Sequence, residues 1–376
     1  MSIVLLAGSA FFLPAAVLSA VSPMVAKLRL LSLEETGSVV GGLSAAGTAG
    51  ALVGTFITGF VLIATLPSRP ILLVVGAVLV LAGLAARWWL ERRPPAASMA
   101  LVLLAGGLAV FSGPPCEYET AYFCVQVEID GDRDSGRVLR LDQLRHAYVD
   151  LDDPTYLDFR YVRLLADVSA ALPPGPLDVL HVGGGGFTFP RYLAAVRPGT
   201  ESLVLEIDPA LVEIAEDELA LERGPDLRVE TGDARLRLDD QPTDAYDLVV
   251  GDAFGSETVP WHLTTVEVAE QLERMLRPGG IYTMNVIDGG PSDFARAELA
   301  TLGEVFDHVA VIHPPGGIPE DRAVNQILVA SASPLPELDV DPADGVVVEG
   351  DALEAFVGDA GPLTDEYAPV DNLVLH

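Results

Sequence analysis

The residues most able to do chemistry gather around a glycine-rich segment in the middle of the chain. An apolar run at 177–182 has the composition of a buried strand and leads directly into four glycines at 183–186. A second apolar run, at 203–208, carries Glu206. Glycines after a strand let a ligand lie against bare backbone at a helix N-terminus, and an acid after the next strand can accept hydrogen bonds from ribose hydroxyls. The combination predicts nucleoside binding, whereas the glycines alone would also suit a tight turn.

Two more acids follow strands of the same kind. Asp233 comes after an expected strand at 227–231, and Asp252 comes after another at 246–250. Ligands of parallel sheets sit beyond the carboxyl ends of the strands, where the strand order reverses. We therefore expect Glu206, Asp233 and Asp252 to share one site with the glycines. Each aspartate alone would also suit a turn or a helix cap.

The elements that must position these residues alternate between strand and helix patterns. Beyond the strands above, we expect strands at 281–286, 305–313 and 325–331, and helices at 156–171, 190–195, 209–222, 264–276 and 292–303. Such alternation predicts an α/β fold with a mostly parallel sheet and helices on both faces. Runs at 121–129 and 137–141 predict a small antiparallel β unit before it. We divide this part into a β unit at 113–150, a catalytic domain at 151–332 and an acidic tail at 333–376, which we expect to pack loosely.

The first 112 residues have the character of a membrane unit with three or four transmembrane helices. Apolar runs occupy 2–22, 36–65, 70–86 and 97–112, and the last is barely long enough to span a bilayer. Glycines spaced through 41–59 would let such helices approach closely. The runs lack the basic start of a signal peptide and carry no internal charge that would suit ion transport. We expect an anchor or scaffold in the lipid bilayer.

The basic residues near these runs bear on topology. The connections at 23–35 and 87–95 hold five basic residues and 66–69 holds one, which places the first two in the cytoplasm. Four spans would then put the rest of the chain outside, and three would leave it inside. Because a nucleoside substrate is made in the cytosol, we expect a multi-pass protein of the cell membrane with a cytoplasmic catalytic domain.

Charge is distributed unevenly along the chain. Through Ser112 there are six basic and three acidic residues, and the totals of 22 and 54 leave 16 and 51 after that point. Such an acidic domain excludes nucleic acid as a partner, because phosphates would be repelled. Lys27 is the only lysine. An acidic, lysine-poor surface suits a salt-rich cytoplasm, and we expect a halophilic source.

Cysteine and histidine provide little evidence of a site. Cys116 and Cys124 are the only cysteines, and the six histidines are scattered without metal-ligand spacing. We expect two free intracellular thiols and no metal. A disulfide is the alternative if this region faces an oxidising space.

From about Tyr118 to Val329, the chain resembles the spermidine synthases, which are polyamine aminopropyltransferases with a Rossmann-like methyltransferase fold. The motifs that carry this resemblance are Arg137-Val138-Leu139-Arg140-Leu141-Asp142, Tyr161, His181-Val182-Gly183-Gly184-Gly185, Glu206-Ile207-Asp208-Pro209, Gly232-Asp233-Ala234, Tyr246 to Asp252 and Leu276-Arg277-Pro278-Gly279-Gly280. Other segments are similar to the membrane-fused members of the family. These are Ser22-Pro23, the glycine-rich run at 41–59, Pro260 to Thr265 and Leu363 to Pro369.

The resemblance implies a co-substrate and a role for each matching residue. The co-substrate would be decarboxylated S-adenosylmethionine, and the acceptor a small amine. Asp252 would help to deprotonate the amine, with Tyr161 lining the site. The cofactor-binding residues would be Gly183, Gly184 and Gly185 in the loop, Glu206 for the ribose, Asp233 for the adenine amino group, and His146 in the place of a family glutamine. Family members are often dimers, which makes a homodimer possible here.

The sequence also departs from the family where a diamine would bind. Gly186 and Gly255 stand where the family has aspartates, and Val162 stands where it has a histidine. Glu257, His262 or Asp288 could substitute, although each also suits a solvated loop. Three functions therefore stay open: an aminopropyltransferase, a methyltransferase using S-adenosylmethionine, and a membrane protein that binds a nucleoside without turnover.

Overall fold

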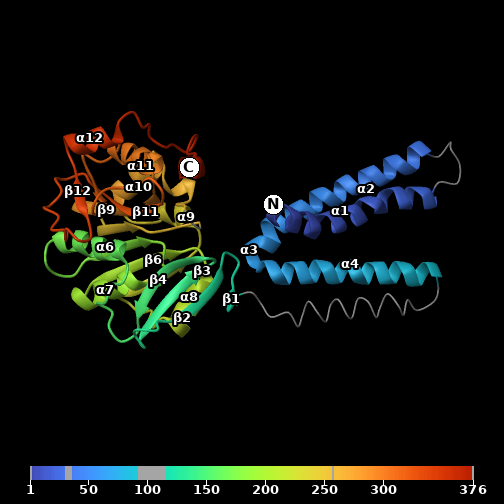
Figure 1. Cartoon of the computed structure of the whole chain (residues 1–376), viewed down its shortest axis with the longest axis horizontal. Coiled ribbons are helices and arrows are strands. Elements are labelled where there is room, and N and C mark those ends of the chain that lie inside the picture. The colour runs from blue at the N-terminus through green and yellow to red at the C-terminus, as the bar shows by residue number, and fades with distance from the viewer. Residues whose placement is uncertain (1, 30–35, 92–115, 256–257, 375–376) are drawn as a thin grey trace. The chain divides into compact units, whose positions relative to one another are not determined.

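The structure is a computed structural model that describes residues 2–29, 36–91, 116–255 and 258–374. The chain divides into two compact units, Met1–Gly106 and Gly107–His376. Figure 1 shows a helical first unit and a second unit of mixed helices and strands. Each unit is described by itself below.

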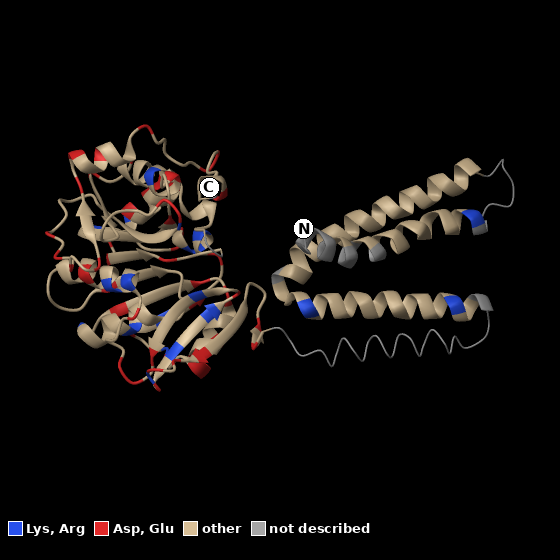
Figure 2. Cartoon of the chain, in the orientation of Figure 1, with Lys and Arg blue, Asp and Glu red and all other residues tan. Residues whose placement is uncertain are grey.

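The first unit is built from long apolar helices. They are α1 (Ser2–Arg29), α2 (Thr36–Ile57) with the π-helical turn Thr58–Leu62, α3 (Ile63–Thr65) and α4 (Ser68–Glu91). By length and composition, the stretches Thr36–Leu62 and Ser68–Trp89 could each cross a membrane. Large apolar side chains such as Phe60 and Leu72 are exposed on them, and Figure 2 shows few charged residues there. The expected run at 97–112 lies outside the described residues.

The second unit begins with a four-stranded antiparallel sheet. Its strands follow one another in the order β1 (Tyr118–Glu119), β2 (Cys124–Ile129), β3 (Gly136–Leu141) and β4 (Leu144–Asp150). The antiparallel unit predicted from the sequence is confirmed. We did not expect β4, because its run contains Arg145 and His146 and lacks a clear alternation.

A disulfide joins Cys116 to Cys124 at the start of this sheet. The expectation of two free thiols is therefore wrong. The two residues are close because Glu119 pairs with Cys124 across β1 and β2, which brings the chain before β1 back beside β2. Disulfides persist mainly in oxidising compartments. This pair thus argues against the cytoplasmic placement that we expected for the domain.

The main sheet has eight strands in the order β12-β10-β11-β9-β8-β5-β6-β7. They are β5 (Asp178–Val182), β6 (Glu201–Glu206), β7 (Leu227–Thr231), β8 (Tyr246–Gly251), β9 (Leu276–Asp288), β10 (His308–His313), β11 (Val324–Ser331) and β12 (Val346–Val348). The five strands β5 to β9 are parallel to one another, and β11, β10 and β12 add to β9 through antiparallel pairs. This confirms the predicted Rossmann-like, methyltransferase-type α/β fold with a small β unit before it.

Helices cover both faces of the main sheet (Figure 1). They are α6 (Arg160–Ala171), α7 (Thr188–Val196), α8 (Pro209–Glu218), α9 (Ala234–Leu238), α10 (Val266–Met275), α11 (Asp293–Gly303), α12 (Asp351–Val357) and α13 (Val370–Val374). Successive side chains along a strand point to opposite faces of the sheet, so each face has its own hydrophobic core. Leu180 and Val182 of β5 pack with α10 and α11, whereas Val179 packs with α6 and α7.

Local signals explain where α8 begins. Pro209 occupies the first turn, where its missing N–H costs nothing, and the Asp208 carboxylate accepts a hydrogen bond from the Ala210 N–H at 3.0 Å. The cap residue Asp208 lies two residues beyond Glu206. The turn between β6 and α8 therefore fixes the backbone that carries the acid.

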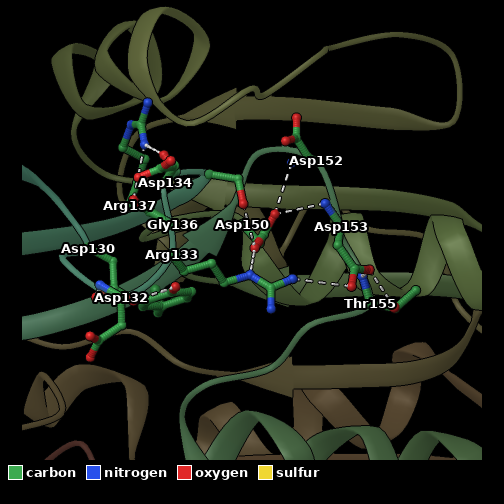
Figure 3. A network of polar contacts seen from close by, with 12 residues as sticks. Asp130, Asp132, Arg133, Asp134, Gly136, Arg137, Asp150, Asp152, Asp153 and Thr155 are labelled. Carbon is green, nitrogen blue, oxygen red and sulfur yellow. Dashed lines mark hydrogen bonds and ion pairs between the residues drawn. The ribbon is translucent and has the colours of Figure 1, made fainter.

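A polar network holds the end of β4 and the segment that leads to α6 (Figure 3). The buried Asp150 carboxylate accepts hydrogen bonds from the Arg133 guanidinium and from the backbone N–H of Asp152 and of Asp153. Burial opposes ionisation of Asp150, but these hydrogen bonds outweigh it and lower the pKa of the carboxyl. Arg133 also lies 4.0 Å from the centre of the Tyr156 ring. These contacts fix the end of β4 against the segment that leads to α6.

The C-terminal segment is part of the fold. Strand β12 pairs with β10, and Leu353, Leu363 and Val370 are buried in the core around α10 and α11. The expectation of a loosely packed tail is therefore wrong. Its abundance of Pro, Asp and Glu concealed the few apolar residues that anchor it.

Removing one of these anchors should destabilise the domain. In Leu363→Ala we expect the free energy of unfolding to fall by about 2–4 kcal/mol, because a buried leucine leaves a cavity that neighbours fill only partly. The measurement is urea unfolding of the full chain in detergent. Leu236, which is 71% exposed, provides the matched control, and Leu236→Ala should change stability by less than about 0.5 kcal/mol. Equal midpoints for the two variants would show that the tail does not support the core.

Candidate active site

The site lies where the strand order of the main sheet reverses. From β5 the chain proceeds outward through β6 and β7, and then returns to the other side of β5 with β8. The loops that follow β8, β5, β6 and β7 are therefore neighbours along one edge. They carry Asp252, the glycines, Glu206 and Asp233 in that spatial order. Such a switch point is where parallel α/β sheets leave room for a ligand.

Gly183 and Asp252 join the two central loops. The Asp252 N–H donates to the carbonyl oxygen of Val182 at 2.9 Å, which extends the pairing of β5 with β8 by one residue. A Cβ on Gly183 would lie 2.5 Å from the backbone oxygen of Asp252, and Gly183 has a φ of +102°. Any side chain there would push the loops apart. The glycine therefore sets the position of Asp252 beside the glycine loop.

Glu206 is bound to the glycine loop by its own carboxylate. One oxygen accepts hydrogen bonds from the N–H of Gly184 at 2.8 Å and of Gly185 at 3.3 Å, and the other accepts from the Asp208 N–H at 2.9 Å. Burial raises the pKa of Glu206, and the three hydrogen bonds oppose that rise. A carboxylate oxygen has lone pairs beyond those used here, so Glu206 can still accept from a ribose hydroxyl.

Asp233 caps the short helix α9. Its side chain accepts a hydrogen bond from the Arg235 N–H at 2.9 Å. The ring nitrogen Nε2 of His262 lies 3.5 Å from the same carboxylate oxygen. The second carboxylate oxygen can serve a ligand. Asp233 can therefore cap α9 with one carboxylate oxygen and bind a ligand with the other.

Asp252 sits among hydrogen-bond donors from two other elements. Its Oδ1 accepts from the Asn285 side-chain amide at 2.8 Å, and its Oδ2 accepts from the Tyr161 hydroxyl at 3.3 Å. Burial raises the pKa of Asp252 to about 7, against the two hydrogen bonds, which lower it. A carboxylate with a pKa near neutrality can accept a proton from a substrate and release it to water.

A cavity of about 190 Å³ opens over these residues. It is lined by Gly183, Gly184, Gly185, Glu206, Asp233, Asp252 and His146, together with Tyr122, Phe123, Phe254, His262 and other residues. Three of its lining residues are acidic, and none of those described is Lys or Arg. We call it the donor cavity. Burial lowers the pKa of His146 to about 4, so this side chain is neutral and adds no positive charge at physiological pH.

A second cavity, of about 430 Å³, meets the first. The two share His146, Asp252 and Phe254 as lining residues. Tyr161, Asn285, Asn325, Arg145 and Arg160 are among those that line only the second. We call it the acceptor cavity. Asp252 therefore stands where contents of the two cavities can meet.

The structure brings together all eight residues singled out from the sequence. Seven line the donor cavity, and Tyr161 reaches Asp252 from the acceptor side. Of the possible substitutes for the missing aspartates, Asp288 is buried and its carboxylate accepts from the N–H of Gly289 and of Ala295, so it caps α11 and is not a solvated loop residue. His262 lines the donor cavity, and Glu257 lies outside the described residues.

Sequence reasoning missed Asn285 as a site residue. It lies in the interior of β9, a strand that we expected for its apolar character alone. The available signal was a single amide within the apolar run 281–287, because a buried polar side chain needs a partner. Phe254 and Tyr122 were missed because aromatic residues in loops carry no spacing signal.

Comparisons with known proteins agree with this geometry. No family model matches the chain. The chain is 32% identical over 150 residues to a polyamine aminopropyltransferase of Vibrio vulnificus, covering 39% of this chain and 49% of that protein. It is 28% identical over 138 residues to a probable polyamine aminopropyl transferase of Bifidobacterium longum, covering 36% of this chain and 30% of that protein. The chain thus spans about half or less of the length of these two relatives.

A solved structure extends the likeness over more of the chain. The probable spermidine synthase of Corynebacterium glutamicum superposes with a TM-score of 0.63 at 27% identity, covering 69% of this chain and 99% of that one. In its sequence relatives and in its fold, the chain is similar to the spermidine synthases and polyamine aminopropyltransferases.

Proposed function

We propose that the protein is a membrane-anchored aminopropyltransferase, which moves an aminopropyl group from decarboxylated S-adenosylmethionine to an amine. The observation that carries this proposal is the position of Asp252, a carboxylate with a pKa of about 7 at the junction of the two cavities. The relatives named polyamine aminopropyltransferase support it.

The reaction needs a neutral amine aligned with a carbon bound to a sulfonium. The nitrogen lone pair of the acceptor forms a bond to that carbon, and the carbon–sulfur bond breaks with its electron pair going to sulfur. The products are an N-aminopropyl amine and methylthioadenosine, and the amine gives up one proton. Ionised Asp252 would orient the amine and accept this proton. Holding both reactants at one junction supplies most of the acceleration.

The protein residues around the donor have distinct tasks in this proposal. Glu206 would accept hydrogen bonds from the ribose hydroxyls, with its orientation fixed by Gly184 and Gly185. Asp233 would accept from the adenine amino group through the oxygen not used in the helix cap. Tyr161 and Asn285 would keep the Asp252 carboxylate turned toward the junction. Neutral His146 would close the wall between the cavities without repelling a sulfonium.

The charge of the donor cavity favours the decarboxylated donor. That molecule carries a sulfonium and an ammonium, and the cavity offers Glu206, Asp233 and Asp252. The carboxylate of S-adenosylmethionine would find no described Lys or Arg in the lining. The N–H groups of Gly184 and Gly185, which could otherwise hold a carboxylate, already donate to Glu206. Because the carboxylate of S-adenosylmethionine would lack a partner, methyl transfer has less support than aminopropyl transfer.

The helices of the first unit support the membrane anchor. Two stretches are long and apolar enough to cross a bilayer, and none of their described side chains is buried. Exposed apolar surface of this extent requires a lipid or protein partner. The proposed role is to hold the enzyme at the membrane.

Donor selectivity tests the proposed function directly. We expect calorimetry on the full chain in detergent to show that decarboxylated S-adenosylmethionine and methylthioadenosine bind at least about tenfold more tightly than S-adenosylmethionine, as expected for a charge left without a partner. The same titrations on Glu206→Gln should show weaker binding of all three. A preference for the carboxylated form would overturn the aminopropyl assignment in favour of methyl transfer.

The second expectation concerns Asp252. In Asp252→Asn, turnover should fall by roughly 10²-fold or more, the scale of losing a general base, while methylthioadenosine binding is kept. For the unchanged protein, the rate should rise with pH and reach half its maximum near pH 7, because only the ionised carboxylate accepts the proton. The measurement is methylthioadenosine release between pH 5.5 and 9.

The variant provides its own control. Asparagine can still pair with Asn285 and Tyr161, so the thermal unfolding of Asp252→Asn should not reveal a folding defect. Its residual rate should lack the rise near pH 7. Unchanged turnover in this variant would remove Asp252 from the mechanism.

A further inference from the structure

Among the described residues, the acceptor cavity has an unpaired arginine in its lining, where a diamine would need a second carboxylate. Besides Asp252, its charged lining residues are Arg145, Asp158 and Arg160. The Asp158 carboxylate is 3.1 Å from the Arg145 guanidinium and is thereby neutralised. This leaves Arg160 as the cation of this lining that has no ion pair among the described residues.

Arg160 has room to bind a ligand. Its Nη2 donates to the carbonyl oxygen of Asn325 at 3.3 Å, and within the described residues it has no ion pair. Asp344, the acid that acts on it, accepts hydrogen bonds from Nε and Nη2 of Arg163 at 2.8 and 2.6 Å. A guanidinium has five N–H donors, so most of those on Arg160 can serve an anion.

The surroundings of Arg160 leave its charge undercompensated. Burial lowers the pKa of Arg160, the nearby charges of Arg163 and Arg322 act in the same direction, and Asp344 opposes them. An arginine stays charged at neutral pH even so. A negative group in the cavity would stabilise the charged guanidinium of Arg160, whereas an ammonium would repel it.

The two positions where the family has aspartates cannot supply the missing negative charge. A Cβ on Gly186 would lie 2.6 Å from the Ala147 Cβ and 3.2 Å from the Val149 Cγ2. Because β4 packs directly against this glycine, an aspartate has no room there. At Gly255 the nearest atoms would be 3.9 Å away, so space exists but no carboxylate does. The packing of β4 against Gly186 therefore excludes the aspartate that the family has at this position.

We propose that the acceptor is an amino acid-like amine, whose remote end carries a carboxylate that binds Arg160. This inference rests on the aminopropyl transfer proposed above and names its acceptor class. The amine enters at Asp252, and the carboxylate extends along the cavity to the first turn of α6, where Arg160 and Tyr161 are consecutive. The bonds made and broken remain those described above. A planar carboxylate can accept two hydrogen bonds from one guanidinium, which would fix the length and direction of the acceptor.

A matched pair of acceptors tests this proposal in the unchanged protein. 4-Aminobutyrate and putrescine have similar length and the same nucleophilic amine, and differ in carrying a carboxylate or an ammonium at the other end. With decarboxylated S-adenosylmethionine as donor, we expect kcat/KM for 4-aminobutyrate to exceed that for putrescine by at least about tenfold. The readouts are methylthioadenosine release and the mass of the N-(3-aminopropyl) product, at one fixed salt concentration.

Variants of Arg160 locate the selectivity. Arg160→Gln should raise the KM for 4-aminobutyrate by about 10- to 100-fold with little change in kcat, the scale of a hydrogen-bonded charge pair. Arg160→Glu should reverse the preference toward putrescine. Arg228 is an exposed arginine on β7 away from both cavities, and Arg228→Gln should leave both acceptors within about twofold. Thermal unfolding of each variant controls for folding.

The outcomes separate this proposal from the one on which it rests. Preference for putrescine, with methylthioadenosine released, would overturn the carboxylate acceptor and keep the aminopropyltransferase. Preference for 4-aminobutyrate that persists in folded Arg160→Gln would overturn the role of Arg160. Should that variant not fold, the acceptor comparison in the unchanged protein still decides the acceptor class. If donor binds but no amine of either kind releases methylthioadenosine, both proposals fail.

Discussion

The site depends on the close approach of two backbone segments. The loop after β5 and the loop after β8 meet at Gly183, where no Cβ can be accommodated beside the Asp252 carbonyl. One consequence is that Asp252 lies directly beside the glycine loop. Another is that the adjacent glycines turn their N–H groups toward Glu206. A single steric requirement thus places the acid for the amine and the acid for the ribose on opposite sides of one glycine loop.

Charge divides this site into two halves of different character. The donor cavity has three acids and no described Lys or Arg, and the acceptor cavity has two arginines, although the chain as a whole has a formal charge of −32. In a protein this acidic, a polycation would be attracted to most of the surface. Selectivity must then arise from short-range contacts, which salt screens little when they are partly buried. An arginine inside the acceptor cavity is such a contact.

The positions of the strands along the chain and the carboxylates at their ends could be predicted from the sequence, because both are local patterns. A buried apolar run that ends in an acid indicates a strand and a position at its carboxyl end, whatever surrounds it. The disulfide could not be predicted in this way, because pairing of Cys116 with Cys124 depends on the register of β1 with β2. Asn285 and Arg160 were missed for a similar reason. Each acts through a cavity that forms only when β9, α6 and the loop after β8 come together.

The C-terminal segment shows how a region without periodicity can still position a site. The carbonyl oxygen of Leu363 accepts the Val266 N–H, and Asp365 accepts from the Thr265 hydroxyl at 2.7 Å and from Arg235 at 2.7 Å. These contacts hold the start of α10 and the start of α9 together. The residues just before α10, including His262 and Leu263, and those at the cap of α9, including Asp233, form one wall of the donor cavity. Because the same carboxylate ties both helix starts, the width of that wall depends on a segment that contributes no lining residue itself.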